Sequence, residues 1–315
     1  MTVSSESGRS RLRDTVERAL DSDVFHSFKA STLTMIAAAV TLVIFLGALL
    51  APWITPQNPF DPSQLDLLDA FLPPAWNEDG EARCWLGTDN LGRDMYSAIL
   101  YGSRVSIGVG IASVLLAMVI GIGLGLVSGY VGGTLDAVIM RVADVQISFP
   151  AILIVLLIDG VMRGILPHDQ HADLALPVVV LAIAVSIWPN FARTVRGSTM
   201  VEKNKEYVQA ARVIGRNPIT IMARHVLPNV MGPVLVIATI SLATAILLEA
   251  ALSFLGVGLP PTEPSLGTLI RIGNDFMFSG EWWIVIFPSL MLATLVLAVN
   301  LLGDWLRDAL NPKLR

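Results

Sequence analysis

The chain is poor in side chains that carry out covalent chemistry. It has one cysteine, Cys84, and four histidines, so it lacks the residues for an internal disulfide or a Cys/His zinc site. The nearest approach to a metal-binding group is His168 and His171 with two neighbouring aspartates. These four residues lie in a short polar stretch between apolar segments, which favours a solvated loop. No catalytic residue, cofactor site or metal site is therefore predicted in this chain.

A nucleotide phosphate site is also missing from the sequence. The phosphate-binding loop GxxxxGK[ST] requires a lysine directly after a glycine. The four lysines, Lys29, Lys203, Lys205 and Lys313, follow Phe, Glu, Asn and Pro. The chain is therefore not expected to hydrolyse ATP, and no nucleic-acid partner is predicted.

The most informative polar segment is NKEYVQAARVIGRNPITIMARHVLPN, residues 204–229. Gly215 stands where the C-terminus of a short helix favours a left-handed residue, and Asn217 and Pro218 resemble the N-cap and first position of a second helix. The spacing i, i+3, i+4, i+7 predicts that the first helix has one apolar face, formed by Tyr207, Ala210, Ala211 and Ile214. In the second helix the corresponding residues are Ile219, Met222, Ala223 and Val226.

Basic side chains occupy the polar sides of this predicted hairpin: Lys203, Lys205, Arg212, Arg216 and Arg224. Three interpretations follow from the residues alone. The hairpin could lie on anionic lipid headgroups, it could be an ordinary loop, or its small residues could dock closely against another protein. His225 has no second ligand near it in the sequence, so packing or capping is favoured over metal binding.

The elements that position this hairpin are membrane spans. Hydrophobic residues make up 54% of the chain and charged residues 15%, with a mean hydropathy of +0.66, which is more apolar than soluble domains of about 45–50% and 25%. Residues 32–54 contain no charge and are long enough to span a bilayer. Similar stretches recur, which predicts an all-α polytopic membrane protein with six transmembrane helices, the later five near 105–128, 138–158, 174–192, 230–254 and 283–303.

The distribution of basic residues orients these spans. If both termini are cytoplasmic, most of the 21 Lys and Arg fall inside, and only Arg83, Arg93, Arg104, Arg163 and Arg271 fall outside. The positive-inside rule therefore predicts cytoplasmic termini. We expect a cytoplasmic segment 1–31, a six-span domain 32–303 and a tail 304–315. That domain includes an outer loop 55–103 and a cytoplasmic loop 193–229.

Three further expectations concern the spans themselves. Gly121, Gly125 and Gly129 recur at four-residue spacing, which lets a neighbouring helix approach closely. Asp159 and Glu249 fall near predicted outer span ends, where snorkelling to water is cheap. Arg141 and Asp144, three residues apart, are expected to pair.

The 204–229 segment resembles the EAA loop of permease subunits in bacterial ABC importers. Gln209, Ala210 and Ala211 stand at the loop's E-A-A positions. Three residues separate them from Gly215, and the segment ends in Leu227 and Pro228. The ending HVLPN is similar to the dipeptide/oligopeptide/nickel branch, as are WLGTDNLGRDMYSAILYGSR, MRVADVQISFP, EAALSFLGVGLPP and NLLGDWLRDALNPKLR. The chain departs from the pattern at Gln209, where Glu is expected, and at Leu266 and Trp305, where Trp and Gly are usual.

The resemblance implies a permease subunit of a binding-protein-dependent importer in the bacterial inner membrane. Such a subunit would form a heterodimer with a related permease. Two ATP-binding subunits would hold ATP and Mg, and a soluble binding protein would deliver substrate. Dipeptides or short peptides are the first expectation for the solute; nickel complexes, glutathione and longer peptides remain alternatives. The residues implied in ATPase docking are Glu206, Tyr207, Gln209, Ala210, Ala211, Gly215, Arg216, His225, Leu227, Pro228 and Asn229.

A rival from a different class is a secondary transporter driven by an ion gradient. It would require charged residues at the bilayer midplane or unwound helices repeated in two halves. Neither feature is evident in the sequence, so alternating access driven by partner ATPases is the favoured mechanism.

Overall fold

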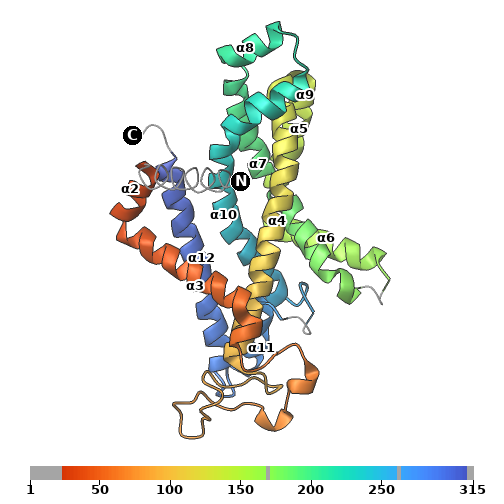
Figure 1. The fold of residues 1–315 in the computed structure, drawn as a ribbon. Coiled ribbons are helices and arrows are strands. Elements are labelled where there is room, and N and C mark those ends of the chain that lie inside the picture. Colours follow the sequence, from red (N-terminus) through yellow and green to blue (C-terminus); the bar gives the residue numbers. More distant parts are fainter. Residues whose placement is uncertain (1–22, 168–170, 261–263, 311–315) are drawn as a thin grey trace, which may run out of the picture.

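The computed structural model describes residues 23–167, 171–260 and 264–310, and these are nearly all helical. Within those ranges the only β contact is one isolated bridge between Thr88 and Asp94. Long helices run between two ends of the molecule, with the 55–94 loop at one end and a helical hairpin at the other (Figure 1). The expected all-α class is therefore confirmed.

The first span lies at the edge of the bundle. After α2 (Asp23–Ala30), α3 covers Thr32–Ile54, which are the predicted bounds. Ser31 starts α3 by accepting a hydrogen bond from the backbone N–H of Thr34 at 3.3 Å. Only a few α3 side chains are buried, because this helix crosses diagonally over α12 (Trp283–Ala309) and α4 (Met95–Val131) rather than packing along its length (Figure 1).

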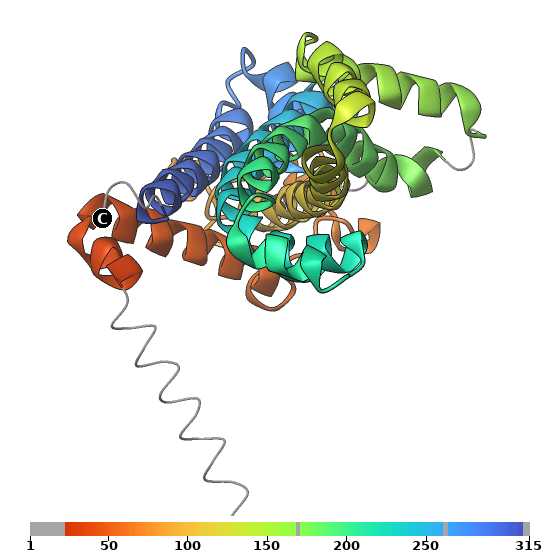
Figure 2. The same ribbon diagram turned by 90° about the horizontal axis from the view of Figure 1, so that it is seen from above.

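Helix α4 is the central rod of the fold. Its 37 residues extend well beyond the predicted span 105–128, to about 55 Å at 1.5 Å per residue. Asp94 caps its start by accepting a hydrogen bond from the N–H of Ser97 at 2.9 Å. Viewed along the bundle, α4 lies among α5, α7 and α10 (Figure 2).

Three glycines bring α4 against α7 (His171–Glu202). A Cβ added to Gly121 would lie 2.4 Å from the Phe191 Cβ, and one added to Gly125 would lie 2.6 Å from the Ala192 carbonyl oxygen. A Cβ on Gly129 would lie 2.8 Å from the Arg196 oxygen. No side chain larger than hydrogen fits at these three positions of α4.

The order of these contacts shows that α4 and α7 run parallel, since later glycines meet later residues of α7. The chain between them must therefore cross back. Among the described residues five helices are long and apolar enough to span a membrane, and the bent pair α5 and α6, counted as one span, gives the sixth crossing that this order requires. At the other edge, Phe28 beside α3 stacks edge-on against Trp305 near the end of α12, at a centroid distance of 5.2 Å. The start of the first span and the end of the last span therefore lie at the same end of the bundle, as six crossings require.

The third crossing differs from the prediction of one straight helix at 138–158. It is broken into α5 (Gly133–Ile147) and α6 (Ala151–Ile165), which meet at an angle of 96°. Pro150 lies in the break: it offers no backbone N–H and disfavours a helical conformation at Phe149. As Figure 1 shows, α6 projects sideways from the bundle.

The remaining helices close the fold. After α7 come α8 (Glu206–Val213), α9 (Pro218–Ile221) and η4 (Met222–Val226), which is one turn of π-helix. Then α10 (Leu227–Phe254) returns along α4, the short α11 (Leu266–Phe276) turns at the loop end, and α12 completes the bundle. The predicted span 230–254 is thus the C-terminal part of a helical stretch that runs over Pro218–Phe254.

Two expectations about charged residues are wrong. Asp144 pairs with Arg193 of α7 rather than with Arg141, because the two helices face each other there. Glu249 does not reach toward water: its side chain is fully buried and accepts hydrogen bonds from Ser106 at 2.6 Å and Ser253 at 2.7 Å. Asp159 is also buried and pairs with Arg163 at 2.6 Å.

Candidate functional site

The hairpin of residues 203–229 turns at a glycine with the predicted geometry. Gly215 has a φ of +78°, which a residue with a side chain adopts only under strain. The N–H of Arg216 donates to the carbonyl of Ala211 at 3.1 Å, and that of Gly215 to the carbonyl of Arg212 at 2.9 Å. This pair of bonds is the Schellman motif, so the end of α8 is fixed by its own backbone.

The second arm starts as the sequence predicts. The side chain of Asn217 accepts a hydrogen bond from the N–H of Ile219 at 2.9 Å, and Pro218 occupies the first helical turn. Instead of ending, this helix continues through the π turn into α10, with Pro228 in the first turn of α10. The second arm is therefore a direct extension of a membrane span.

The apolar face predicted for α8 is only partly correct. Ala211 is buried, but Tyr207, Ala210 and Ile214 are exposed, and the second buried residue is Val208. Val208 and Ala211 belong to the same core cluster as Ile221 and Val226 of the other arm. The helix is rotated relative to the prediction because its partner is the second arm of the hairpin itself.

The tip of the hairpin exposes three large apolar side chains, of which Ile214 and Ile219 belong to the predicted apolar faces and Val213 does not. Val213 is 88% exposed, Ile214 76% and Ile219 69%. They flank Gly215, around which an added Cβ would meet no atom within 4 Å. The sequence signal for this exposed tip was Ile214, a branched apolar residue directly before the helix-ending Gly215 in a polar loop. Clustered exposed apolar residues indicate an interaction surface.

Polar contacts tie the hairpin to the end of α4. The ammonium of Lys203 donates to the carbonyl of Gly129 at 2.7 Å. The guanidinium of Arg212 lies 4.9 Å from the centre of the Tyr130 ring, and its Nε donates to the Tyr130 hydroxyl at 3.3 Å. The hairpin therefore contacts the central rod as well as α7 and α10.

The base of α8 is fixed to α7. The hydroxyl of Tyr207 donates to Glu202, which also pairs with Lys205 at 2.6 Å. Burial and this hydrogen bond to a carboxylate raise the pKa of Tyr207 to about 12. Tyr207 therefore stays a hydrogen-bond donor at physiological pH.

The other predicted docking residues spread along the hairpin. Glu206, Gln209, Ala210 and Arg216 are exposed on α8 and the turn, and Pro228 and Asn229 are exposed at the start of α10. Leu227 packs against the core. His225 is half-buried, with its Nδ1 unbonded, and its carbonyl accepts a hydrogen bond from the Asn229 side chain at 2.7 Å. Most of the predicted docking residues are therefore exposed on the hairpin.

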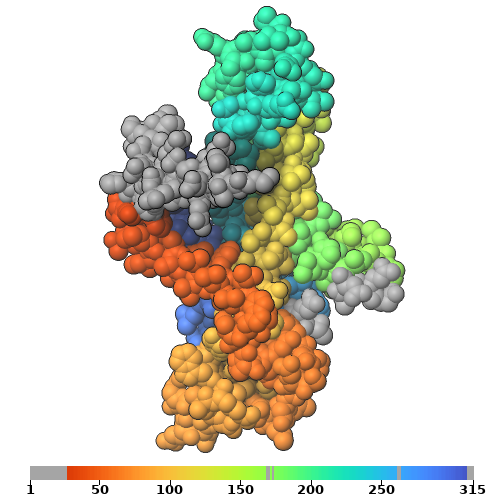
Figure 3. All heavy atoms as spheres, viewed as in Figure 1, coloured from red at the N-terminus to blue at the C-terminus, as the bar shows by residue number. Residues whose placement is uncertain are grey.

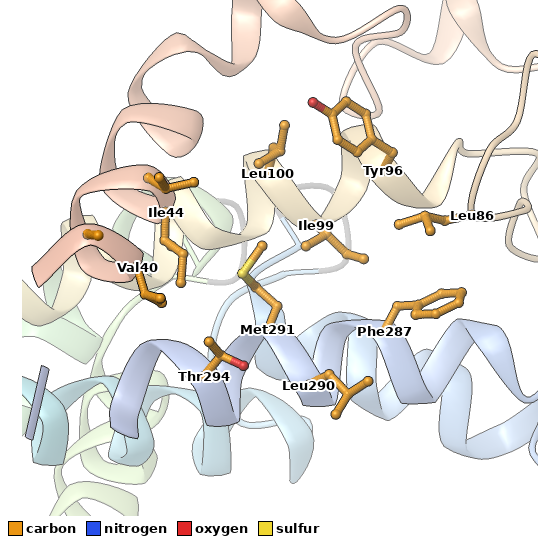
Figure 4. A pocket seen from close by; sticks show the side chains of 12 residues that line it. Val40, Ile44, Leu86, Tyr96, Ile99, Leu100, Phe287, Leu290, Met291 and Thr294 are labelled. Carbon is orange, nitrogen blue, oxygen red and sulfur yellow. The ribbon is translucent and has the colours of Figure 1, made fainter. Parts of the chain in front are cut away.

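No group of three or more potential metal ligands is present among the described residues. The His168 cluster weighed in the sequence falls largely outside the described residues, and His171 bonds to the carbonyl of Leu166 at 2.9 Å. A groove of about 500 Å³ lies between α3, α4 and α12 (Figure 4). Its walls are almost entirely apolar, with Tyr96 and Thr294 as the hydroxyl-bearing exceptions, so it suits hydrocarbon rather than a charged solute.

Comparison with known proteins agrees with this geometry. Residues 121–315 match the family described as binding-protein-dependent transport system inner membrane component. Residues 22–74 match the N-terminal TM domain of oligopeptide transport permease C.

Curated relatives align over most of the chain. The dipeptide transport system permease protein DppC of Haemophilus influenzae is 39% identical, covering 91% of this chain and 93% of the relative. The di/tripeptide transport system permease protein DppC of Pseudomonas aeruginosa is also 39% identical, covering 87% and 86%. The glutathione transport system permease protein GsiD of Pectobacterium atrosepticum is 39% identical, covering 89% and 88%.

A solved structure shares the fold. An inward-facing MetNI methionine ABC transporter chain superposes with a TM-score of 0.53 at 19% identity, covering 68% of this chain and 96% of that chain. The chain therefore belongs to the family of binding-protein-dependent transport system inner membrane components. It is a multi-pass permease subunit of an ABC importer, from a family whose members work with ATP-binding and further permease subunits rather than as enzymes.

Proposed function

We propose that this subunit imports dipeptides or short peptides by alternating access, driven by ATP hydrolysis in two partner subunits. A second, related permease completes the pathway, and a soluble binding protein delivers the peptide from outside. ATP and Mg are held by the partners, since this sequence has no phosphate-binding loop. The 203–229 hairpin and both termini face the cytoplasm.

One observation carries the mechanism: the hairpin presents an apolar tip while its base is bonded to three long helices. An unsupported loop would absorb the movement of a partner by bending. The Schellman turn, the contacts with Gly129 and Tyr130, and the continuity with α10 instead convert that movement into a displacement of spans.

The proposed solute class rests on the relatives. Two of the relatives compared are named for dipeptide or di/tripeptide transport, which favours a short peptide. Glutathione, itself a tripeptide, is the named cargo of another relative at the same identity. Short peptides with free termini are therefore the first substrates to measure.

Uptake of radiolabelled dialanine tests the proposal. A strain without its own peptide importers should accumulate dialanine when this chain is expressed with its partner subunits. Replacing the phosphate-loop lysine of the partner ATPases should abolish uptake. Uptake that survives this replacement but collapses with a protonophore would establish the secondary-transporter alternative, for which the buried carboxylate of Glu249 is the favouring observation.

The proposed orientation needs a probe other than the native thiol. Cys84 is only 7% exposed, so a maleimide has little access to it. Leu68 is 90% exposed on the same loop, and a Leu68→Cys change in a Cys84→Ser background provides an accessible thiol. A membrane-impermeant maleimide should label it from outside; labelling only after lysis of the inner membrane would invert the topology.

A further inference from the structure

One face of the central helix α4 is bare. Although α4 packs against most of the other long helices, Ile111 is 38% exposed, Leu115 51% and Val119 67%. Arg104 and Gly108 continue the same line toward the loop end, and both are exposed. Steps of three and four residues place all five on one side of a helix. A central helix with an open face is available to line a passage.

Arg104 has no partner for its charge within the described chain. Three other arginines toward the loop end, Arg83, Arg93 and Arg163, each contact a carboxylate within 2.6 Å. Arg104 forms no hydrogen bond or ion pair with the described residues. It lies in the part of α4 that precedes the predicted span 105–128, so its charge faces the loop end of the molecule and is available to a solute.

A cavity of about 350 Å³ opens beside this arginine. Phe60 and Tyr101 form an edge-to-face pair in its wall, with ring centres 5.2 Å apart, and Leu176 of α7 closes another side. Gly108 leaves room, since an added Cβ there would meet no atom within 4 Å. Small-molecule sites span about 300–1,000 Å³, so this cavity fits a small solute and not a protein segment.

We propose that Arg104 binds the C-terminal carboxylate of a transported peptide in this cavity. The inference rests on the proposed function and adds a contact for the solute. The planar guanidinium matches a carboxylate through two parallel N–H donors, and aromatic walls accept apolar side chains. The same rod carries the hairpin contacts at Gly129 and Tyr130, so hairpin movement displaces the cavity.

The test compares dialanine with dialanine amide, which lacks the carboxylate. The full transporter is reconstituted in proteoliposomes, and initial uptake is measured with peptide-loaded binding protein at a limiting concentration, where a lost contact lowers the rate. In Arg104→Gln, dialanine uptake should fall about tenfold or more, the loss typical of a charge-assisted hydrogen bond, while the lower uptake of the amide stays unchanged. In Arg104→Lys, dialanine uptake should fall by less than in Arg104→Gln.

Arg141→Gln is the matched control, because Arg141 is another exposed arginine on a membrane helix, and it should transport both peptides normally. Gly108→Trp places an indole in the cavity, from a position where a Cβ meets no atom within 4 Å, and should block uptake, whereas Gly160→Trp, with the same space around its Cβ, should not. Equal loss of acid and amide uptake in Arg104→Gln would assign the arginine to a lipid phosphate or to subunit packing and overturn the inference. Unchanged dialanine uptake would also overturn it. If the unmodified transporter moves no peptide, the proposed function itself fails.

Discussion

The 55–94 loop and the 203–229 hairpin lie at opposite ends of the molecule (Figure 3), and their shapes are held in different ways. The loop has almost no regular structure, and several of its polar side chains are bonded within the chain. Arg93 and Asp89 form a buried ion pair at 2.6 Å, and the indole of Trp283 donates to the carbonyl of Thr88 at 2.9 Å. The loop is therefore held by side-chain contacts, although Leu68 and Trp85 remain exposed.

The hairpin has regular helices and a fixed turn, yet it leaves Val213, Ile214 and Ile219 in contact with water. Burying one such side chain contributes about 1.5–3 kcal/mol, and that free energy is not recovered within this chain. The difference lies in what holds each shape: side-chain bonds fix the irregular loop, whereas backbone bonds at the Schellman turn fix the hairpin. Both ends expose large apolar side chains, so exposure alone does not identify the end that another protein covers.

The largest expected effect comes from Gly215→Val. The left-handed backbone strains the new residue by about 1–2 kcal/mol, and its side chain holds the tip off its partner. Membrane abundance should stay normal, while ATPase retention and peptide uptake are lost. Gly280→Val is the control at the other end, because Gly280 also has a positive φ and open space around it. If Gly215→Val keeps its ATPases and transports normally, the hairpin does not couple the ATPase subunits to peptide uptake.

A large effect on the loop is expected from Arg93→Ala. Removing the guanidinium leaves the Asp89 carboxylate buried without its ion-pair partner, which costs about 3–5 kcal/mol. The loop should open, and Cys84 should react with maleimide much faster than in the unchanged protein. Arg83→Ala, which removes two exposed ion pairs, should not open the loop and should not speed the reaction. Equal rates in all three forms would show that the buried pair does not hold the loop.

A smaller effect is expected at the tip itself. Ile214→Ser removes apolar surface without straining the backbone, so ATPase affinity should fall by about tenfold, the equivalent of 1.4 kcal/mol. Val201→Ser, exposed at the end of α7, is the matched control and should bind the ATPases normally. ATPase retention on an affinity column measures both variants. An equal loss in Ile214→Ser and Val201→Ser would assign the effect to general surface hydrophobicity and not to the tip.

The smallest effect concerns the thiol of the loop. Burial, followed by the charge of Asp94, raises the pKa of Cys84. Because only the thiolate reacts, its alkylation rate should rise to a half-maximum at a higher pH than that of the exposed cysteine in Leu68→Cys. Coincident pH profiles would mean that Cys84 is not enclosed.

Much of this fold is encoded in local sequence. The uncharged stretch 32–54, the glycine at 215 and the cap at Asn217 gave correct predictions, because each depends only on neighbouring residues. The six crossings also follow from apolar length, although the 96° break between α5 and α6 does not. Proline occurs inside α7 and α10 without ending them, so Pro150 alone could not reveal a break.

The errors arise where packing between distant segments decides. The face of α8 is set by Val226 and Ile221 of the other arm, which its own periodicity cannot indicate. Asp144 meets Arg193, and Glu249 meets Ser106, across long sequence separations. The tip was not recognised because the prediction placed Ile214 on one apolar face with Ala211, whereas the packing of α8 buries Ala211 and leaves Ile214 exposed.

The most direct measurement is a crosslink from the tip. Ile214→Cys in a Cys84→Ser background places one thiol beside Gly215, and a short thiol-to-amine crosslinker should join it to an ATP-binding subunit in native membranes. Ile165→Cys, 73% exposed at the end of α6, is the matched control and should give no such product. A crosslink to the ATPase from residue 214 and none from residue 165 is the predicted result. Reaction of the residue 214 thiol with lipid-phase probes, with no ATPase product, would show instead that the hairpin lies on the membrane surface.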